Sequence, residues 1–248
     1  MEKVRSKETH QDKIPIAILI GSGSRLPAII KSSKNPNSCF YPSIVVSHKK
    51  ESDGIDYAKN FRIPAVYWNF VEWKNKTAKS RQVYMQALGY LVSQSYYKPE
   101  LVVTAGWDLI LTLDFLNFFK RENGNFNVIN LHPAPLPDNP EEKSVKFADG
   151  ITVPVLKGEI DQILPQVLKF KFARWGSTVH FLTEKVDQGP VILRSEVNVN
   201  ANDTIDTLKK RLQNAEDQIL PAAINLFACS KLKIENGKVK ILDTYNEK

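Results

Sequence analysis

The chain has 248 residues, of which 42% are hydrophobic and 25% charged, a composition typical of a globular protein. Lys and Arg number 34 against 27 Asp and Glu, so the formal net charge is +7 at pH 7. The basic residues are spread along the chain between acidic ones, which favours a solvated basic surface over a nucleic-acid site. No run of about 18 apolar residues occurs, and the polar N-terminus lacks the apolar stretch of a signal peptide. We therefore expect no nucleic-acid partner and no membrane partner.

The cysteine usage favours a reducing compartment. The only two cysteines, Cys39 and Cys229, are far apart in the sequence. They provide no disulfide framework, and no group of His, Cys, Asp and Glu has the spacing of a metal site, so we expect neither a disulfide nor a metal. The cytosol or nucleus is the simplest compartment for such a chain, and we take the cytoplasm as the prediction.

In the first half of the chain, short apolar runs alternate with helical patterns after a polar tail, residues 1–13, that we expect to be disordered. The predicted strands cover 14–20, 43–47, 63–67, 101–104 and 128–131. The first predicted helix contains Leu26, Ile29 and Ile30, and the others cover 53–61, 80–97 and 109–119. Strands that alternate with helices indicate β-α-β units and a mainly parallel sheet with helices on both faces.

The second half of the chain has a different pattern. Two strands at 178–182 and 191–197, joined by a turn, predict an antiparallel pair. A long helical pattern covers 203–229, in which Pro221 is expected to break or kink the helix. A terminal hairpin is expected to turn at Asn236-Gly237. The predicted fold is α/β, a single-domain Rossmann-like open sheet, mainly parallel, with an antiparallel C-terminal portion.

A glycine-rich loop, Gly21-Ser22-Gly23-Ser24, follows the first predicted strand and precedes the first predicted helix. Glycines at such a place let backbone N–H groups approach an anion, and the helix dipole favours negative charge. Leu26 stands where a dinucleotide-binding loop would have its third glycine, and no Gly-Lys-Ser/Thr follows. We favour a phosphate monoester site, with Arg25 adding a positive charge, over a purely structural turn.

Asn130 and His132 end the fifth predicted strand, where ligands bind in open α/β sheets. Residues two apart in a strand point the same way, so an amide and an imidazole are expected at one site. An amide N–H stabilises an oxyanion and an imidazole moves a proton, although a lone histidine is more often structural. Asp187 is either a turn residue or a carboxylate that holds His132 and raises its pKa. His180 is interpreted as a hydrogen-bonded core residue.

Taken together, these segments resemble the formyltetrahydrofolate-dependent formyltransferase family. The glycine loop resembles the branch that acts on 5′-phosphoribosylglycinamide (GAR) more than the branch that acts on tRNA. The similar segments appear in the family's order, and they are 16–30 (IAILIGSGSRLPAII), 101–111 (LVVTAGWDLIL), 128–137 (VINLHPAPLP), 176–193 (GSTVHFLTEKVDQGPVIL) and 213–221 (QNAEDQILP). The pair of Asn-x-His-Pro and Asp-x-Gly-Pro-Val is the specific part of this resemblance.

The resemblance implies roles for individual residues. The catalytic residues would be Asn130, His132 and Asp187. The GAR contacts would be Gly23, Ser24, Arg25, Gln213 and Glu216. The folate contacts would be Arg81, Leu109, Ile110, Leu111, Asn130, Thr183 and Asp187. Asp108-Leu109 replaces a Met-Arg pair of the family, Arg25 replaces a small amide, and the chain departs from the family pattern after Pro137.

The implied activity is transfer of the formyl group of 10-formyltetrahydrofolate, as co-substrate, to the amine of GAR in purine biosynthesis, without a metal. Two alternatives remain from the residues, a related formyltransferase or formyltetrahydrofolate hydrolase and a non-catalytic phosphometabolite-binding protein. A third, an RNA-binding module, rests on charge alone. We expect a monomer or homodimer with one domain over 14–248. It would divide into a phosphate-binding half (14–130) and a folate and catalytic half (131–248) with a divergent insert at about 141–175.

Overall fold

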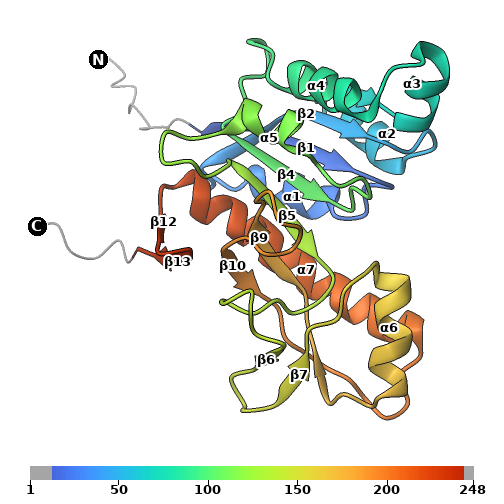
Figure 1. The fold of residues 1–248 in the computed structure, drawn as a ribbon, viewed down its shortest axis with the longest axis vertical. Helices are drawn as coiled ribbons and strands as arrows, with labels where there is room; N and C mark the ends of the chain where they lie inside the picture. The colour runs from blue at the N-terminus through green and yellow to red at the C-terminus, as the bar shows by residue number, and fades with distance from the viewer. Residues whose placement is uncertain (1–12, 243–248) are drawn as a thin grey trace, which may run out of the picture.

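A seven-stranded sheet forms the centre of the molecule (Figure 1). The computed structural model describes residues 13–242, so the predicted disordered tail lies, except for Lys13, outside the described residues. The strand order is β10-β9-β5-β4-β1-β2-β3. The strands are β1 (Ile14–Ile20), β2 (Phe40–Ser47), β3 (Ala65–Tyr67), β4 (Leu101–Ala105), β5 (Val128–His132), β9 (Thr178–Phe181) and β10 (Val191–Arg194).

The first five strands are parallel, whereas β9 pairs antiparallel with both β5 and β10. Strand β1 lies between β2 and β4, and its side chains from Ile16 to Ile20 are fully buried. A continuous apolar run is typical of a strand that is covered on both faces. The predicted α/β fold with a mainly parallel sheet and an antiparallel portion is therefore confirmed.

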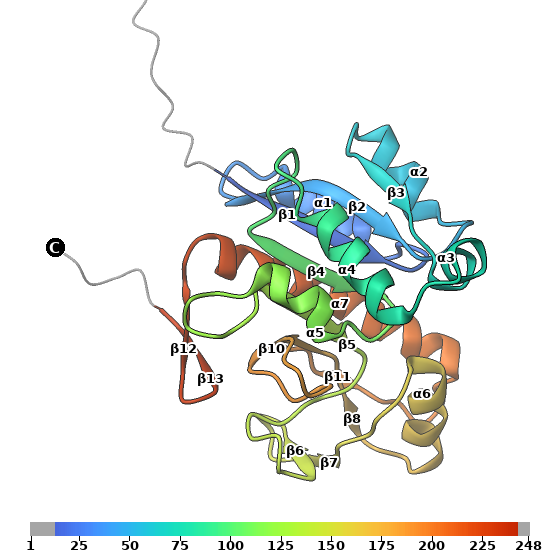
Figure 2. The ribbon, with the colours of Figure 1, turned by 45° about the horizontal axis from the view of Figure 1, so that its top comes forward.

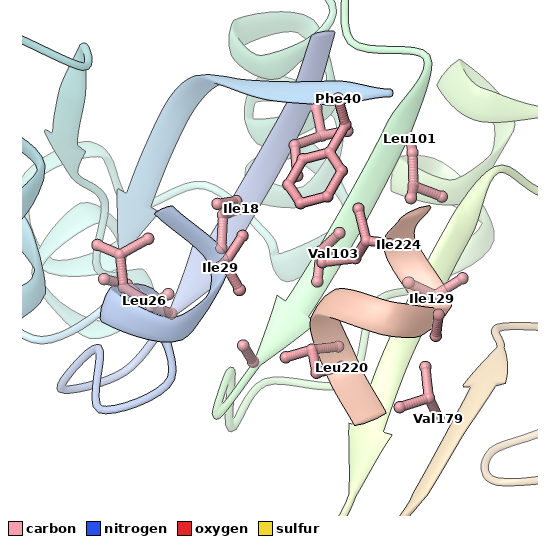
Figure 3. Close-up of a cluster of buried hydrophobic side chains, with 14 of the residues drawn as sticks. Ile18, Leu26, Ile29, Phe40, Leu101, Val103, Ile129, Val179, Leu220 and Ile224 are labelled. Atoms are coloured by element: carbon pink, nitrogen blue, oxygen red, sulfur yellow. The ribbon is translucent and has the colours of Figure 1, made fainter. Parts of the chain in front are cut away.

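Helices cover both faces of the sheet. One face carries α1 (Leu26–Ser33), α2 (Asp53–Asn60) and the C-terminal half of α7 (Ile205–Ala228). The other carries α3 (Phe70–Thr77), α4 (Arg81–Val92), α5 (Leu113–Leu116) and the 3-10 helix η1 (Asn117–Phe119). Figure 3 shows side chains of α1 and α7 pointing at strand residues such as Ile18, Val103 and Ile129. These two apolar layers hold the sheet in place.

The divergent insert at about 141–175 forms most of a small lobe beyond the sheet (Figure 2). It contains a hairpin of β6 (Ser144–Lys146) and β7 (Thr152–Pro154), α6 (Ile160–Lys169), and the pair of β8 (Arg174–Trp175) and β11 (Val197–Asn198). Buried Phe147 and Trp175 pack there against Leu208 and Leu212 of α7. One long helix thus spans both parts of the molecule.

Several predicted boundaries differ from the structure. The predicted helix at 109–119 begins only at Leu113, and the predicted strand at 191–197 divides into β10 and β11, which pair with different strands. Helix α7 continues through Pro221, because the helix packs on the sheet on both sides of the proline. The terminal hairpin, β12 (Leu232–Glu235) and β13 (Lys238–Ile241), is confirmed. Within residues 13–242, no helix has the length and apolar character needed to cross a membrane.

The expectation of unpaired cysteines is wrong, because Cys39 and Cys229 form a disulfide. Their Cα atoms lie 5.4 Å apart although 190 positions separate them in the chain. The start of β2 lies beside the end of α7, where the N–H of Cys39 donates to Oδ1 of Asn225 at 2.9 Å. Spacing along the sequence carries no information about this contact, which depends on how α7 returns to the sheet.

Candidate active site

The candidate residues gather at the edge where the parallel strands end. The glycine loop follows β1, Gly106 follows β4, and Asn130 and His132 end β5. A Cβ built on Gly21 would lie 2.5 Å from the carbonyl oxygen of Gly106, so the loops after β1 and β4 are in direct contact. The chain leaves β1 in one direction for β2 and reaches β4 on the other side, which makes this edge a topological switch point.

His132 and Asp187 lie side by side at this edge. His132 is the last residue of β5 and pairs with Thr178 of β9. After the lobe the chain runs through β9 and turns back into β10. Asp187 lies in the turn between these two strands with a φ of 55°. The distance between Nδ1 of His132 and Oδ1 of Asp187 is 3.5 Å. The turn therefore brings the carboxylate to the imidazole, as the catalytic interpretation of the sequence requires.

The protonation of His132 differs from the prediction. Burial lowers its pKa from the ordinary value, and the negative charge of Asp187 raises it by a smaller amount. The prediction of a raised pKa considered the carboxylate but not the burial of a side chain that is only 6% exposed. The Nε2 atom is also buried and has no hydrogen-bond partner within residues 13–242. At neutral pH this lowered pKa favours a neutral imidazole, in which Nδ1 faces Asp187 and Nε2 is the other ring nitrogen.

Asn130 lies between two hydrogen-bonding neighbours. Its Oδ1 is 2.6 Å from the hydroxyl of Thr104 on β4, and its Nδ2 is 3.4 Å from Nε2 of His180 on β9. His180 is fully buried, and its Nδ1 lies 2.9 Å from the carbonyl oxygen of Phe181. Burial lowers the pKa of His180 to about 4, assisted by the charge of His132. The interpretation of His180 as a hydrogen-bonded core residue is confirmed.

The glycine loop is held through its carbonyl groups. Hydroxyls of Ser47 and Ser52 donate to the carbonyl oxygen of Gly21, and Gly23 has a φ of 90°. A Cβ on Gly23 would lie 2.5 Å from Cα of Gly54, which only glycine at both positions permits. Among residues 13–242, the hydrogen bonds include none in which the N–H of Gly23, Ser24 or Arg25 is the donor. These N–H groups are available for an anion.

The guanidinium of Arg25 contacts α7 rather than the glycine loop. Its guanidinium donates to the carbonyl oxygen of Gln213 at 2.5 Å and to Oδ1 of Asp217 at 2.9 Å, and it lies 3.7 Å from Glu216. The expectation that Arg25 adds a free positive charge is therefore corrected, because α7 supplies two carboxylates that pair with it. The contact nevertheless joins the glycine loop to the part of α7 that carries Gln213 and Glu216.

Glu216 is a buried carboxyl group at the same junction. The hydroxyl of Ser177 donates to its Oε1 at 2.6 Å. Burial raises the pKa of Glu216, while Ser177 and Arg25 act in the opposite direction. Sequence reasoning missed Ser177 and Asp217, since nothing in their neighbourhood marks them as partners of residues near the loop.

The predicted folate residues form two groups. Arg81 begins α4 and donates to the carbonyl oxygen of Ile110 at 2.7 Å, so it contacts the loop that contains Leu109 and Leu111. Ile110 is exposed and Leu111 is buried. Thr183 lies in the same turn as Asp187, and its hydroxyl donates to the carbonyl oxygen of Lys185.

His48, Lys49 and Asp108 form a further polar cluster beside the glycine loop. Nε2 of His48 lies 3.2 Å and Nζ of Lys49 lies 3.6 Å from Oδ2 of Asp108. The contact with His48, and to a smaller extent Lys49, lowers the pKa of Asp108. His48 follows β2 directly, so it lies at the same edge of the sheet as the glycine loop.

Known proteins resemble this chain over most of its length. The family model described as "Formyl transferase" matches residues 14–224. The human trifunctional purine biosynthetic protein adenosine-3 is 33% identical over 233 residues, which are 92% of this chain, while the chain spans 20% of the length of that relative. The phosphoribosylglycinamide formyltransferase of Escherichia coli (strain K12) is 28% identical over 222 residues, which are 90% of each chain.

The fold agrees with a solved structure of the same kind. Glycinamide ribonucleotide transformylase 1 from Symbiobacterium toebii superposes with a TM-score of 0.77 at 29% identity, over 93% of this chain and 95% of that one. The matched region of the family model begins with β1 and ends within α7, so it includes all seven strands of the central sheet. The chain therefore belongs to the formyl transferase family.

Proposed function

We propose that the protein transfers the formyl group of 10-formyltetrahydrofolate to the amine of 5′-phosphoribosylglycinamide. The observation that carries this proposal is the buried imidazole of His132, two residues from the amide of Asn130. Asp187 lies beside its Nδ1, and its Nε2 has no partner among the described residues 13–242. The names of the relatives from E. coli and S. toebii support GAR as the acceptor.

The phosphate of GAR would bind at the glycine loop. The free N–H groups of Gly23, Ser24 and Arg25 lie at the N-terminus of α1, where the helix dipole favours an anion. Because Arg25 is paired with Asp217, its backbone rather than its side chain would contact the phosphate. Gln213 and Glu216 lie across from the loop on α7 and would contact the rest of GAR.

The folate would lie on the opposite side of His132. Arg81 and the loop of Leu109, Ile110 and Leu111 would contact it from the N-terminal end of α4. Thr183 and Asp187 would contact it from the turn between β9 and β10. Side chains from both halves of the chain would then share one substrate site, which favours a single functional unit over 14–248.

The proposed chemistry needs one oxyanion contact and one proton carrier. The amine nitrogen attacks the formyl carbon, and the C=O bond becomes a C–O⁻ that accepts a hydrogen bond from Nδ2 of Asn130. Neutral His132 takes a proton at Nε2 from the attacking nitrogen, and Asp187 stabilises the imidazolium. His132 then returns the proton to the folate nitrogen as its bond to the formyl carbon breaks. The reaction starts from a neutral imidazole in this proposal, because burial lowers the pKa of His132.

The location, the oligomeric state and the partners of the protein are predicted from the sequence alone. A cytoplasmic location, a monomeric or homodimeric state, and the absence of nucleic-acid and membrane partners are sequence-based predictions. The same holds for the functional division at residues 130 and 131 and for the role of the insert at about 141–175. The reaction as written uses no metal, and residues 13–242 contain no group of three or more His, Cys, Asp or Glu that could hold one.

The decisive experiment is a product assay. Purified protein is mixed with 10-formyltetrahydrofolate and GAR, and formyl-GAR is measured by mass spectrometry. We expect formyl-GAR to form with the wild type, and turnover to fall by about 10²–10⁴ in His132→Ala. Asn117→Ala, at an exposed position of η1, is the control. Formate released without GAR would instead identify a hydrolase, and binding of GAR without any product would identify a non-catalytic protein.

A further inference from the structure

Thr104 is a polar residue in a strand that is otherwise apolar. Strand β4 has the sequence LVVTA, all five residues are buried, and Thr104 is 3% exposed. It pairs in register with Asn130 of the neighbouring parallel strand. Its Oγ1 lies 2.6 Å from Oδ1 of Asn130. A buried hydroxyl needs a hydrogen-bond partner, and here that partner is the candidate oxyanion-binding residue.

The hydrogen bonds of His180 determine which atom of the Asn130 amide donates and which accepts. The carbonyl oxygen of Phe181 can only accept, so Nδ1 of His180, at 2.9 Å, must carry the hydrogen. The ring is neutral because burial lowers its pKa to about 4, so Nε2 has no hydrogen and acts as the acceptor. Nδ2 of Asn130 must then be the donor to His180 at 3.4 Å.

This assignment orients the amide of Asn130. With Nδ2 toward His180, Oδ1 faces Thr104, and the hydroxyl of Thr104 donates to it. The other acceptor near that hydroxyl, the carbonyl oxygen of Ile129, is more distant at 3.3 Å. A rotation of the amide by 180° would bring Oδ1 against the lone pair of His180. The Thr104 and His180 contacts therefore favour the same orientation.

We propose that Thr104 is a positioning residue that holds the Asn130 amide with its second Nδ2–H available to the developing oxyanion of the substrate. This inference rests on the proposed function. One N–H of Asn130 donates to His180, which leaves one for the reaction. Without the Thr104 hydroxyl, Oδ1 loses its donor and the amide is held from one side only. The oxyanion contact is then formed in a smaller fraction of complexes.

The test compares Thr104→Val with Thr104→Ser. Valine has nearly the shape of threonine but no hydroxyl, whereas serine keeps the hydroxyl. We expect Thr104→Val to lower kcat by about tenfold, less than the 10²–10³ expected for removing an oxyanion donor, with KM for GAR and folate within about twofold. Thr104→Ser is expected to retain kcat within about threefold of the wild type. Thr207→Val is the matched control, since it removes a hydroxyl that accepts a hydrogen bond from the N–H of Thr204 at the N-terminus of α7, and it should leave kcat unchanged.

Two further measurements separate positioning from a general packing effect. In an Asn130→Ala background, Thr104→Val should cause no further loss of kcat, because the residue through which it acts is absent. The side-chain ¹H–¹⁵N signals of Asn130 should shift in Thr104→Val and remain near their wild-type positions in Thr104→Ser. This readout needs no turnover, so it tests the positioning even if the wild type forms no formyl-GAR. Wild-type kcat in Thr104→Val, or equal losses in the two Thr104 variants, would overturn the proposal.

Discussion

The buried neutral histidine at position 180 makes the stability of the protein sensitive to acid. Its pKa is about 4 in the folded chain, against an ordinary value of 6.5. Below pH 6.5 the unfolded chain therefore takes up a proton at His180 while the folded chain does not. The difference of 2.5 pH units, at 1.36 kcal/mol each, corresponds to about 3 kcal/mol. This contribution to the free energy of unfolding is complete above pH 6.5 and is lost as the pH falls toward 4.

The perturbation is His180→Gln, which keeps a polar side chain but removes the titration. Urea unfolding is followed by tryptophan fluorescence at several pH values between 7 and 4.5 for both proteins. At pH 7 the variant should be the less stable, since its side chain fills the buried position less well. The difference in the free energy of unfolding should then shrink toward low pH, by about 3 kcal/mol when extrapolated to pH 4.

A second background tests the cause. In acid His132 takes up a proton, and the positive charge that it then carries is one of the reasons why the pKa of His180 is low. In a His132→Gln background, the same comparison should give a smaller pH-dependent difference, because that charge is absent. Curves for wild type and His180→Gln that run parallel from pH 7 to 4.5 would refute the reasoning. They would mean that His180 titrates alike in the folded and unfolded chains.

Three other predictions concern the loop, the carboxylate and the disulfide. Asp187→Asn should lower the pKa of His132 further, since Asp187 opposes the effect of burial, and should lower kcat by about 10²–10⁴; an NMR titration that gives the same His132 pKa in both proteins would contradict this. Inorganic phosphate should protect the amides of Gly23–Arg25 from hydrogen exchange, and unchanged exchange at saturating phosphate would leave the loop a structural turn. For a loop of 190 residues, chain entropy predicts that Cys229→Ser lowers the free energy of unfolding by up to about 5 kcal/mol; denaturation that is insensitive to reductant in the wild type would argue against the disulfide.

The hydrogen bonds around Asn130 lie within the central sheet. Thr104, Asn130 and His180 lie on three adjacent strands, β4, β5 and β9, so the sheet register determines how their side chains meet. Asp187, in contrast, lies in a turn with a positive φ. A mutation in that turn should change the position of the carboxylate while the amide of Asn130 stays in place.

Patterns in the sequence were enough to predict the features that depend on neighbouring residues. The apolar run of β1 indicated a strand buried on both faces, and Asn236-Gly237 indicated the last hairpin, because such patterns arise from local backbone geometry. The alternation of side chains along a strand was enough to place Asn130 and His132 at one edge of the sheet. Local patterns therefore predicted the sheet and one half of the candidate site.

Which distant residues meet, and how their charges balance, depends on the packing of the whole chain. The 3.5 Å contact between His132 and Asp187 depends on the path of β9 and its turn, and the disulfide depends on the return of α7 to β2. Arg25 is neutralised by Asp217, a residue almost two hundred positions away. The neutral state of His132 is a consequence of burial, and burial belongs to the packed molecule rather than to any segment of its sequence.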